Sequence, residues 1–155
     1  MENLIKVSRP NRDTTFAIIA KVVSLRATCL RAKVGAVIVK DKRIVSIGYN
    51  GALPGENHCS LDTCVPDSPC TTTIHAEVNA IFHAAKSGIP LDGATIYCTH
   101  SPCQRCSEAI IQTGIKRLVY IKLYRETPFT LLERNLKIDQ IDESQLSYFI
   151  EEIRD

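Results

Sequence analysis

The sequence predicts an α/β fold, a three-layer α-β-α sandwich whose mixed central sheet has about five strands. Segments with helical periodicity alternate with short runs rich in β-branched residues along the 155-residue chain. A short polar link joins the first two predicted strands, which should therefore pair antiparallel, whereas helices connect the later strands. We expect a single domain that spans residues 1–155.

In the first half of the chain, a helix should precede a β-hairpin. Asp13 is a suitable N-cap for a helix over Thr14–Cys29, in which apolar residues recur at helical spacing. The hairpin strands are expected at 34–39 and 43–49. Residues 50–72 show no apolar periodicity and are rich in glycine, proline, asparagine and cysteine. A loop of this length is usually functional or held by specific contacts.

The second half alternates helices and strands. Gly88 and Gly114 are placed where glycine commonly ends a helix, and Pro102 where proline commonly begins one. The expected elements are, in order, a helix from His75 to Gly88, a strand at 94–99, a helix from Pro102 to Gly114 and a strand at 116–122. The tail should hold one or two helices, most clearly at 143–154, with 137–141 as a candidate short strand.

Composition narrows the class of protein. Hydrophobic residues make up 45% and charged residues 23%, the balance of a globular protein, and a net charge of +2 gives no electrostatic argument for a nucleic-acid partner. No apolar run reaches the ~20 residues that span a bilayer. Residues 1–6 contain an early acid and no apolar signal core, so we expect a cytoplasmic protein. The chain has seven cysteines, and in the reducing cytoplasm cysteines favour metal binding over disulfides.

Two short motifs indicate a zinc site. His75-Ala76-Glu77 lies at the start of one predicted helix, and Pro102-Cys103-Gln104-Arg105-Cys106 at the start of another. One imidazole and two thiolates can hold zinc and leave the fourth tetrahedral position to water, whose pKa the ion lowers toward ~7. H-x-E followed by P-C-x-x-C is the signature of zinc-dependent nucleobase deaminases, in which the glutamate transfers protons. The alternatives are a structural zinc knuckle, or a buried histidine beside a redox CxxC pair.

The chain resembles the deoxycytidylate (dCMP) deaminases of bacteria and phages, which have a cytidine deaminase-like fold. The resemblance covers most of residues 10–125 and rests on Val34–Val39, Gly48-Tyr49-Asn50-Gly51, His75–Ile81 and Pro102–Cys106. It implies hydrolysis of dCMP to dUMP and ammonia, which feeds thymidylate synthesis. Free-cytidine, riboflavin-pathway and transfer-RNA adenosine deaminases resemble the chain less at these motifs.

The resemblance also implies roles for single residues. Glu77 would be the catalytic proton carrier, with His75, Cys103 and Cys106 as the zinc ligands. The backbone of Ala76 would meet the base carbonyl, and Asn50 would hold the sugar or the base edge, although an asparagine before glycine also suits a turn.

Three further residues are candidates for substrate contact on chemical grounds. Arg26 is a candidate cation for the 5′-phosphate, and the alternative, with equal weight, is that it is a solvated surface residue. Tyr120 and Tyr124 are candidates to flank the base or the sugar, with packing in the core as the alternative.

A second, structural zinc is expected from the same resemblance. Cys29, Cys59, Cys64 and Cys70 match the positions of such a site in the phage and bacterial branch. A Cys₄ site would tie the first helix to the long loop just before His75. The alternative is a set of buried free thiols, because the spacing is not a regular CxxC pair.

Regulation and assembly follow from the resemblance alone. Relatives are commonly homohexamers that dCTP activates and dTTP inhibits, with Mg²⁺ accompanying the nucleotide. The segment Gly48, Tyr49, Asn50 and Gly51 would take part in this allosteric control. Two other functions stay open: a related zinc deaminase acting on another nucleotide or on transfer-RNA adenosine, and a non-catalytic zinc-binding interaction module.

Overall fold

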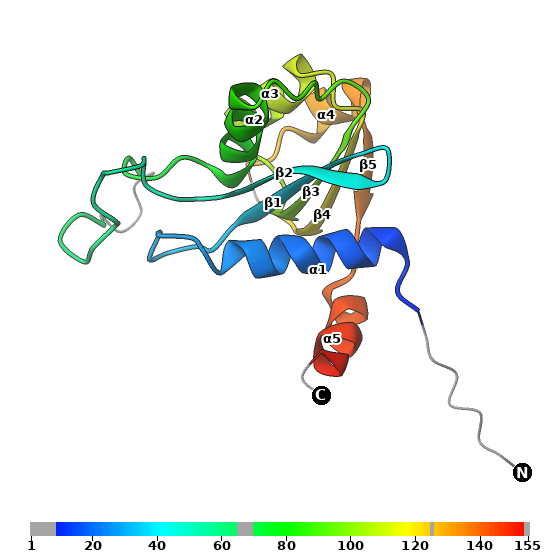
Figure 1. The fold of residues 1–155 in the computed structure, drawn as a ribbon, viewed down its shortest axis with the longest axis horizontal. Coiled ribbons are helices and arrows are strands. Elements are labelled where there is room, and N and C mark those ends of the chain that lie inside the picture. Colours follow the sequence, from blue (N-terminus) through cyan, green and yellow to red (C-terminus); the bar gives the residue numbers. More distant parts are fainter. Residues whose placement is uncertain (1–8, 65–69, 125, 154–155) are drawn as a thin grey trace, which may run out of the picture.

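A five-stranded sheet forms the centre of the molecule (Figure 1). The computed structural model describes residues 9–64, 70–124 and 126–153. The strands in spatial order are β2 (Arg43–Tyr49), β1 (Gly35–Lys40), β3 (Thr95–His100), β4 (Arg117–Lys122) and β5 (Lys137–Gln140). β1 pairs antiparallel with β2 and β3, whereas β4 pairs parallel with β3 and β5. The predicted mixed sheet is therefore confirmed.

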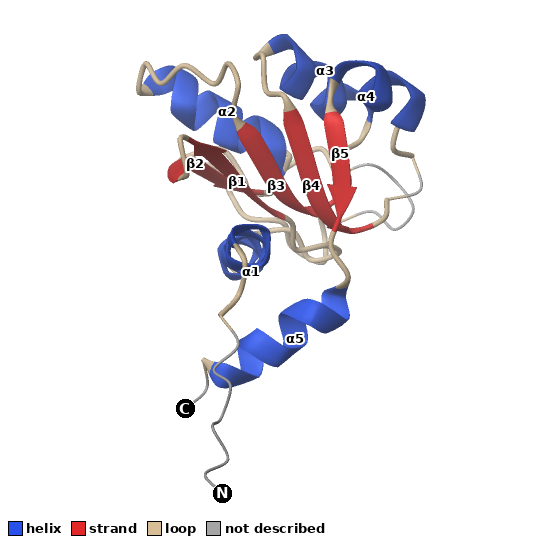
Figure 2. Ribbon diagram, turned by 90° about the vertical axis from the view of Figure 1, so that its right-hand side faces the viewer, coloured by secondary structure: helices blue, strands red, loops and turns tan. Residues whose placement is uncertain are grey.

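Helices cover both faces of this sheet, as the three-layer prediction requires (Figure 2). On one face lie α2 (Ala76–Lys86), α3 (Gln104–Gln112) and α4 (Phe129–Asn135). On the other face lie α1 (Arg12–Ser24) and α5 (Glu143–Glu152). The C-terminal helix is predicted to end at residue 154. In the structure Ile153 is its C-cap, and residue 154 lies outside the described residues.

Two separate apolar cores follow from the alternation of side chains along the strands. Ile38, Ile96 and Leu118 pack toward α2, α3 and α4. Neighbouring residues such as Val37 and Val119 pack toward α1 and α5. Successive side chains of a strand point to opposite faces, so a strand buried on both faces reads as a continuous apolar run.

The predicted hairpin between β1 and β2 is confirmed, together with its turn. Asp41 and Lys42 have φ angles of 50° and 65°, in the left-handed region. Two consecutive residues with positive φ define the type I′ turn, whose twist matches that of the strands it joins.

The first helix differs from its prediction at both ends. Asn11, and not Asp13, is the N-cap of α1, and its side chain accepts a hydrogen bond from the Thr14 N–H at 2.8 Å. The helix ends at Ser24, well before Cys29, and the Thr28 N–H then donates to the carbonyl of Asn50. This contact with the end of β2 takes the backbone out of the helical path.

Asp13 has a different function in the fold. Its carboxylate accepts hydrogen bonds from both terminal nitrogens of Arg117, at 2.8 and 2.7 Å, and from the Tyr97 hydroxyl at 2.7 Å. Arg117 also donates through Nε to Asp139 at 2.7 Å. The hydrogen bond from Arg117 lowers the pKa of Asp13, and this network links α1, β3, β4 and β5.

Candidate functional site

The starts of α2 and α3 bring the predicted metal ligands together. His75 and Cys103 are the N-cap residues of these helices, and neither side chain makes a capping hydrogen bond. Both residues have the extended backbone that is usual at an N-cap, and without a capping bond their side chains remain available to a metal ion. Cys106 lies in the first turn of α3 and is buried.

The geometry of the three side chains fits a zinc ion. The Nδ1 atom of His75 is 3.5 Å from the Cys103 sulfur and 3.4 Å from the Cys106 sulfur. Zinc bonds of ~2.05 Å to nitrogen and ~2.3 Å to sulfur, at a tetrahedral angle, would place those atoms about 3.6 Å apart. Within the described parts of the chain, this is the only group of three or more candidate ligands whose ligand atoms all lie within 4.8 Å of one another.

The two thiols differ in how readily they lose a proton. Hydrogen bonds with Cys106 and His75 lower the pKa of Cys103 to about 3, so that this sulfur is a thiolate at neutral pH. The hydrogen bond with Cys103, together with burial, raises the pKa of Cys106. A bound metal ion would deprotonate that thiol outright. Helix N-termini add a favourable field for both anions.

Glu77 lies beside these ligands in a nearly closed environment. It occupies the first turn of α2 and is only 4% exposed. Burial raises the pKa of its carboxyl group, and a hydrogen bond with Cys106 partly opposes that rise. A buried carboxyl group with a raised pKa can both accept and return a proton near neutral pH.

Asn50 follows β2 directly and is buried. Its Oδ1 accepts the Val34 N–H at 2.8 Å, and its Nδ2 donates to the carbonyl of Ala32 at 2.8 Å. The amide therefore closes the start of β1 against the end of β2. One N–H of the amide group is left by these two bonds.

The remaining predicted substrate residues lie in different environments. The Arg26 guanidinium stands 5.9 Å from the centre of the Tyr49 ring. Tyr120 is buried against Phe129, whereas Tyr124 is 38% exposed and its N–H donates to the Ser101 hydroxyl at 2.7 Å. Tyr120 is thus part of the core in this structure, and Tyr124 is on the surface. Ala76 is buried, and as the first residue of α2 its N–H has no acceptor within the helix.

The four cysteines of the predicted second site fall into two groups. Cys29 and Cys59 are buried. Desolvation is the main cause of the raised pKa of Cys64, and Cys59 and Cys29 add to it. Cys70 instead lies beside the hydroxyls of Thr72 and Thr73, at 3.1 and 3.3 Å. Although desolvation opposes it, these hydrogen bonds lower the pKa of Cys70 to about 6. The described residues do not bring all four sulfurs within 4.8 Å of one another.

Ser101 is a site residue that the sequence interpretation missed. Its buried hydroxyl oxygen accepts the Tyr124 N–H and the Thr127 hydroxyl, both at 2.7 Å. It thereby joins the Cys103 corner to the segment after β4. A small polar residue immediately before the Pro-Cys pair was the available signal.

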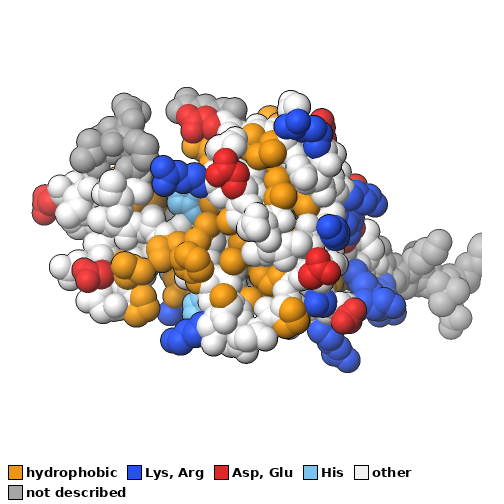
Figure 3. Space-filling model, turned by 90° about the horizontal axis from the view of Figure 1, so that it is seen from above, with side chains coloured by type: hydrophobic (Ala, Val, Ile, Leu, Met, Phe, Trp, Pro, Cys, Tyr) orange, Lys and Arg blue, Asp and Glu red, His pale blue; other side chains and the backbone are white. Residues whose placement is uncertain are grey.

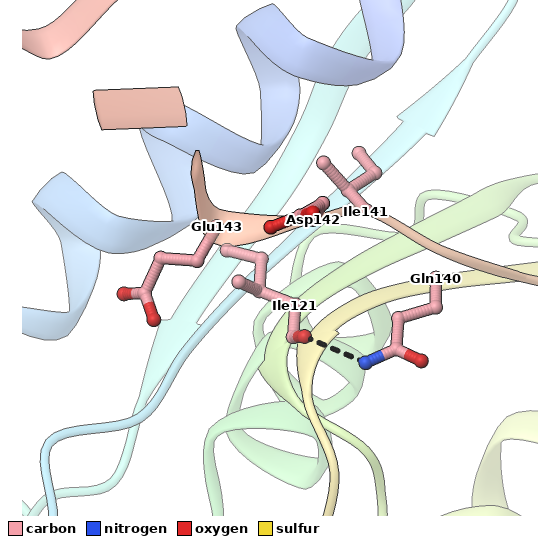
Figure 4. Close-up of a pocket in the computed structure, with 5 residues that line it drawn as sticks. All are labelled: Ile121, Gln140, Ile141, Asp142 and Glu143. Atoms are coloured by element: carbon pink, nitrogen blue, oxygen red, sulfur yellow. Dashed lines mark hydrogen bonds between the residues drawn. The ribbon is translucent and has the colours of Figure 1, made fainter. Parts of the chain in front are cut away.

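A pocket of about 440 Å³ opens at the ends of β4 and β5 (Figure 4). It is lined by Ile121, Gln140, Ile141, Asp142 and Glu143, and the Gln140 side chain donates to the Ile121 carbonyl. None of these residues belongs to the His75 cluster. In the described residues, no helix has the length and apolar character needed to cross a membrane.

Comparison with known proteins places this geometry in a family. Residues 10–122 match the family model described as the cytidine and deoxycytidylate deaminase zinc-binding region. The chain is 47% identical over 115 residues to ComE operon protein 2 of Bacillus subtilis (strain 168), a match that covers 74% of this chain but only 61% of that protein. It is 42% identical over 128 residues to the deoxycytidylate deaminase of Mycobacterium phage D29, covering 75% of this chain and 98% of the phage protein.

A solved structure shares the fold. The dCMP deaminase from the cyanophage S-TIM5, in complex with dCMP and dUMP, superposes with a TM-score of 0.78 at 33% identity, over 86% of this chain and 99% of that chain. This likeness confirms the cytidine deaminase-like fold expected from the sequence. Through residues 10–122 and the His75, Cys103 and Cys106 triad that they contain, the chain belongs to the zinc-binding cytidine and deoxycytidylate deaminase family.

Proposed function

We propose that this protein hydrolyses dCMP to dUMP and ammonia, with zinc as its cofactor. The observation that carries the proposal is the buried Glu77 next to a ligand triad with zinc-like spacing. Relatives named deoxycytidylate deaminase, and the cyanophage enzyme with dCMP and dUMP bound, support the choice of substrate.

His75, Cys103 and Cys106 would hold the ion, which supplies a water molecule of lowered pKa when bound. Glu77 would carry two protons in turn: the first from the attacking water to N3 of cytosine, and the second from the hydroxyl group added at C4 to the departing amine, which leaves as ammonia. Its burial keeps the carboxyl group out of exchange with bulk water. The two thiolates would balance the charge of the metal ion.

Substrate contacts are proposed at the same corner. The free N–H of Ala76 would bind the base carbonyl, and the remaining amide hydrogen of Asn50 would reach the sugar. Tyr124 is exposed enough to lie against the nucleotide, whereas Tyr120 would have to act through its neighbours. Arg26, held over the Tyr49 ring, would supply positive charge to the phosphate.

The test is deamination of dCMP, followed by loss of aminopyrimidine absorbance, for wild type, Glu77→Gln and Glu133→Gln. Glu133 is exposed on α4, so its variant controls for the loss of a carboxylate. We expect Glu77→Gln to lose at least about 10²-fold in kcat with zinc content unchanged, and Glu133→Gln to match wild type.

Other outcomes would redirect the assignment. If the zinc-loaded wild type is silent on dCMP but deaminates another nucleotide or transfer-RNA adenosine, the family stands and the substrate is wrong. If no substrate is turned over by wild type or by Glu77→Gln, a non-catalytic zinc-binding module is the better description. If both proteins turn over dCMP equally, the assignment of Glu77 as the proton carrier is wrong.

We also propose a second, structural zinc at Cys29, Cys59 and Cys64, with Cys70 as the fourth ligand. The contact of Cys64 with Cys59, and the weaker influence of Cys29 on the same thiol, support it. Cys70 would have to leave its hydrogen bonds with Thr72 and Thr73, and the other three sulfurs would have to move closer together, to form the site. A zinc content of about two per chain that falls by one in Cys59→Ser would support the site. A content of about one in both proteins would contradict it.

Regulation and assembly are proposals of the same kind. Nucleotides dCTP and dTTP, with Mg²⁺, would act through Gly48, Tyr49, Asn50 and Gly51, and the protein would form a homohexamer. Apolar side chains gather on the face formed by α2, α3 and α4, where Phe82 is 58% exposed, which suits contact between subunits (Figure 3). Sedimentation, and activity across dCTP and dTTP titrations, test both; a monomer with flat activity would contradict them.

A further inference from the structure

Residues at the end of β2 contact the backbone both before and after His75. Before His75, Ile74 forms a two-way bridge with Gly51: the Gly51 N–H donates to the Ile74 carbonyl at 3.2 Å, and the Ile74 N–H to the Gly51 carbonyl at 2.9 Å. After His75, the first turn of α2 lies directly on Gly48. The residue that bears the metal-binding imidazole is therefore fixed by one short stretch of a neighbouring strand.

The contact at Gly48 leaves no space for a side chain. A Cβ atom there would lie 2.2 Å from the Ala76 carbonyl oxygen and 2.4 Å from the Ala80 nitrogen, both backbone atoms of α2. One turn further along, the buried Ser46 hydroxyl donates to the Ala80 carbonyl at 2.7 Å. The helix that presents His75 and Glu77 is thus seated against β2 at backbone distance.

Asn79 is the polar connection between these two elements. Its Oδ1 accepts the Tyr49 N–H at 3.2 Å, and its own N–H donates to the His75 carbonyl at 2.9 Å. An N–H donor requires an oxygen acceptor, so the orientation of the Asn79 amide group is fixed by this contact. A continuous route of two hydrogen bonds therefore runs from the backbone of Tyr49 to the backbone of His75.

We propose that Asn79 is a positioning residue, which holds His75 and Glu77 in register with the segment 48–51. This inference rests on the proposed function and adds a role to it: the segment 48–51, which contains Asn50 and lies beside Arg26, also positions the metal-binding corner. A ligand that moves Tyr49 would thus change the position of His75 without touching it. Residues that orient metal ligands commonly change activity or metal affinity by about 10- to 100-fold when they are removed.

The experiment compares Asn79→Ala, Asn79→Asp and Asn135→Ala in the full-length, metal-loaded protein. Aspartate retains the acceptor oxygen, and Asn135 is an exposed asparagine on α4 whose side chain bonds only to a carbonyl of its own helix. For Asn79→Ala we expect kcat on dCMP to fall about tenfold or more, with KM changed much less. Asn79→Asp should recover most of kcat, and Asn135→Ala should match wild type.

A second measurement does not depend on the substrate. Replacing zinc by Co²⁺ gives visible absorption bands that report the ligand geometry at the metal, and a Cys103→Ser protein supplies the background from any other cobalt site. We expect the bands to shift in Asn79→Ala and to return in Asn79→Asp. If the wild type does not act on dCMP, the proposed function fails, while the cobalt spectra still decide the role of Asn79.

Three results would overturn the inference. Unchanged kcat and spectra in Asn79→Ala would show that the contact does not position the site. Equal damage in Asn79→Ala and Asn79→Asp would show that the acceptor oxygen is not what matters. A lower melting temperature with unchanged spectra and kcat would assign Asn79 to stability alone.

Discussion

Single cysteines of this protein take different states because their surroundings differ. Burial raises the pKa of Cys98 well above its ordinary value, which keeps this thiol protonated inside the sheet. Cys103, at the start of a helix and hydrogen-bonded to Cys106 and His75, has a pKa lowered to about 3. Cys106 also has a raised pKa, so what distinguishes the two metal-binding cysteines from Cys98 is their place beside His75, where a bound metal ion would deprotonate Cys106.

We therefore expect two buried cysteines to respond differently to the same substitution. Cys106→Ser should lose about one zinc per chain and nearly all activity, because a hydroxyl group is a poor zinc ligand. Cys98→Ser should retain its metal and lose about 1–3 kcal/mol of unfolding free energy, since it buries a hydroxyl group in an apolar core. Zinc content and urea unfolding of both proteins provide the measurement. Equal zinc content in the two variants would contradict the assignment of Cys106.

The contact between β2 and α2 is the feature at the scale of elements that constrains the site most. Gly48 is needed there because the helix backbone passes too close for any side chain. The sequence interpretation associated Gly48 with regulation, and the structure adds a packing reason for glycine at this position. A residue can satisfy both requirements.

Gly48→Ala should displace α2, with a cost of about 3 kcal/mol in unfolding free energy and a marked loss of activity. Gly55 is the matched control, because nothing lies within 4 Å of a Cβ atom placed there. Its φ of +86° makes Gly55→Ala cost about 1 kcal/mol through backbone strain alone, with activity retained. Urea unfolding and dCMP turnover measure both effects. A Gly48→Ala protein as active and stable as Gly55→Ala would show that the helix is not seated as described.

Local sequence was sufficient to predict most elements and the cluster of candidate metal ligands, His75, Cys103 and Cys106. The hairpin, α2 and α3 depend on nearby turn and cap residues, and the ligands are close to the starts of their helices. The cap of α1 was not predictable in this way, because Asp13 suits a cap but is bound by Arg117, more than a hundred residues away. The contact of Tyr49 with Asn79 likewise joins residues that only the folded sheet brings together.

At the scale of the whole molecule, the Arg117 network connects both ends of the chain. Asp13 belongs to the first helix and Asp139 to the last strand, and Arg117 binds both. Tyr97 adds a bond from the middle of the sheet. The network lies apart from the metal ligands, so its contribution should be to stability and not to chemistry.

The stability that Asp13 provides should depend on pH in a defined direction. Its pKa is lowered from 3.8 in the folded protein, so its contribution is complete above the unfolded value and is lost as the pH falls through the folded value. Asp13→Asn should cost about 1 kcal/mol at pH 7, a modest figure because the side chain is 34% exposed. Below pH ~4 the difference from wild type should shrink.

Urea unfolding at pH 7 and at acidic pH tests this dependence. The exposed Asp62→Asn serves as control and should show little difference at either pH. An Asp13→Asn penalty that stayed constant or grew in acid would contradict the ion-pair assignment.

The strand β5 has a consequence for solubility. Without it, β4 would be the border of the sheet, a run of four buried residues with unpaired backbone groups open to another chain. β5 is only four residues long and carries Lys137 and Asp139, a short and charged strand of the kind that discourages edge-to-edge pairing. A chain cut at Lys122 would therefore be expected to aggregate, although residues 10–122 are the part that matches the family model.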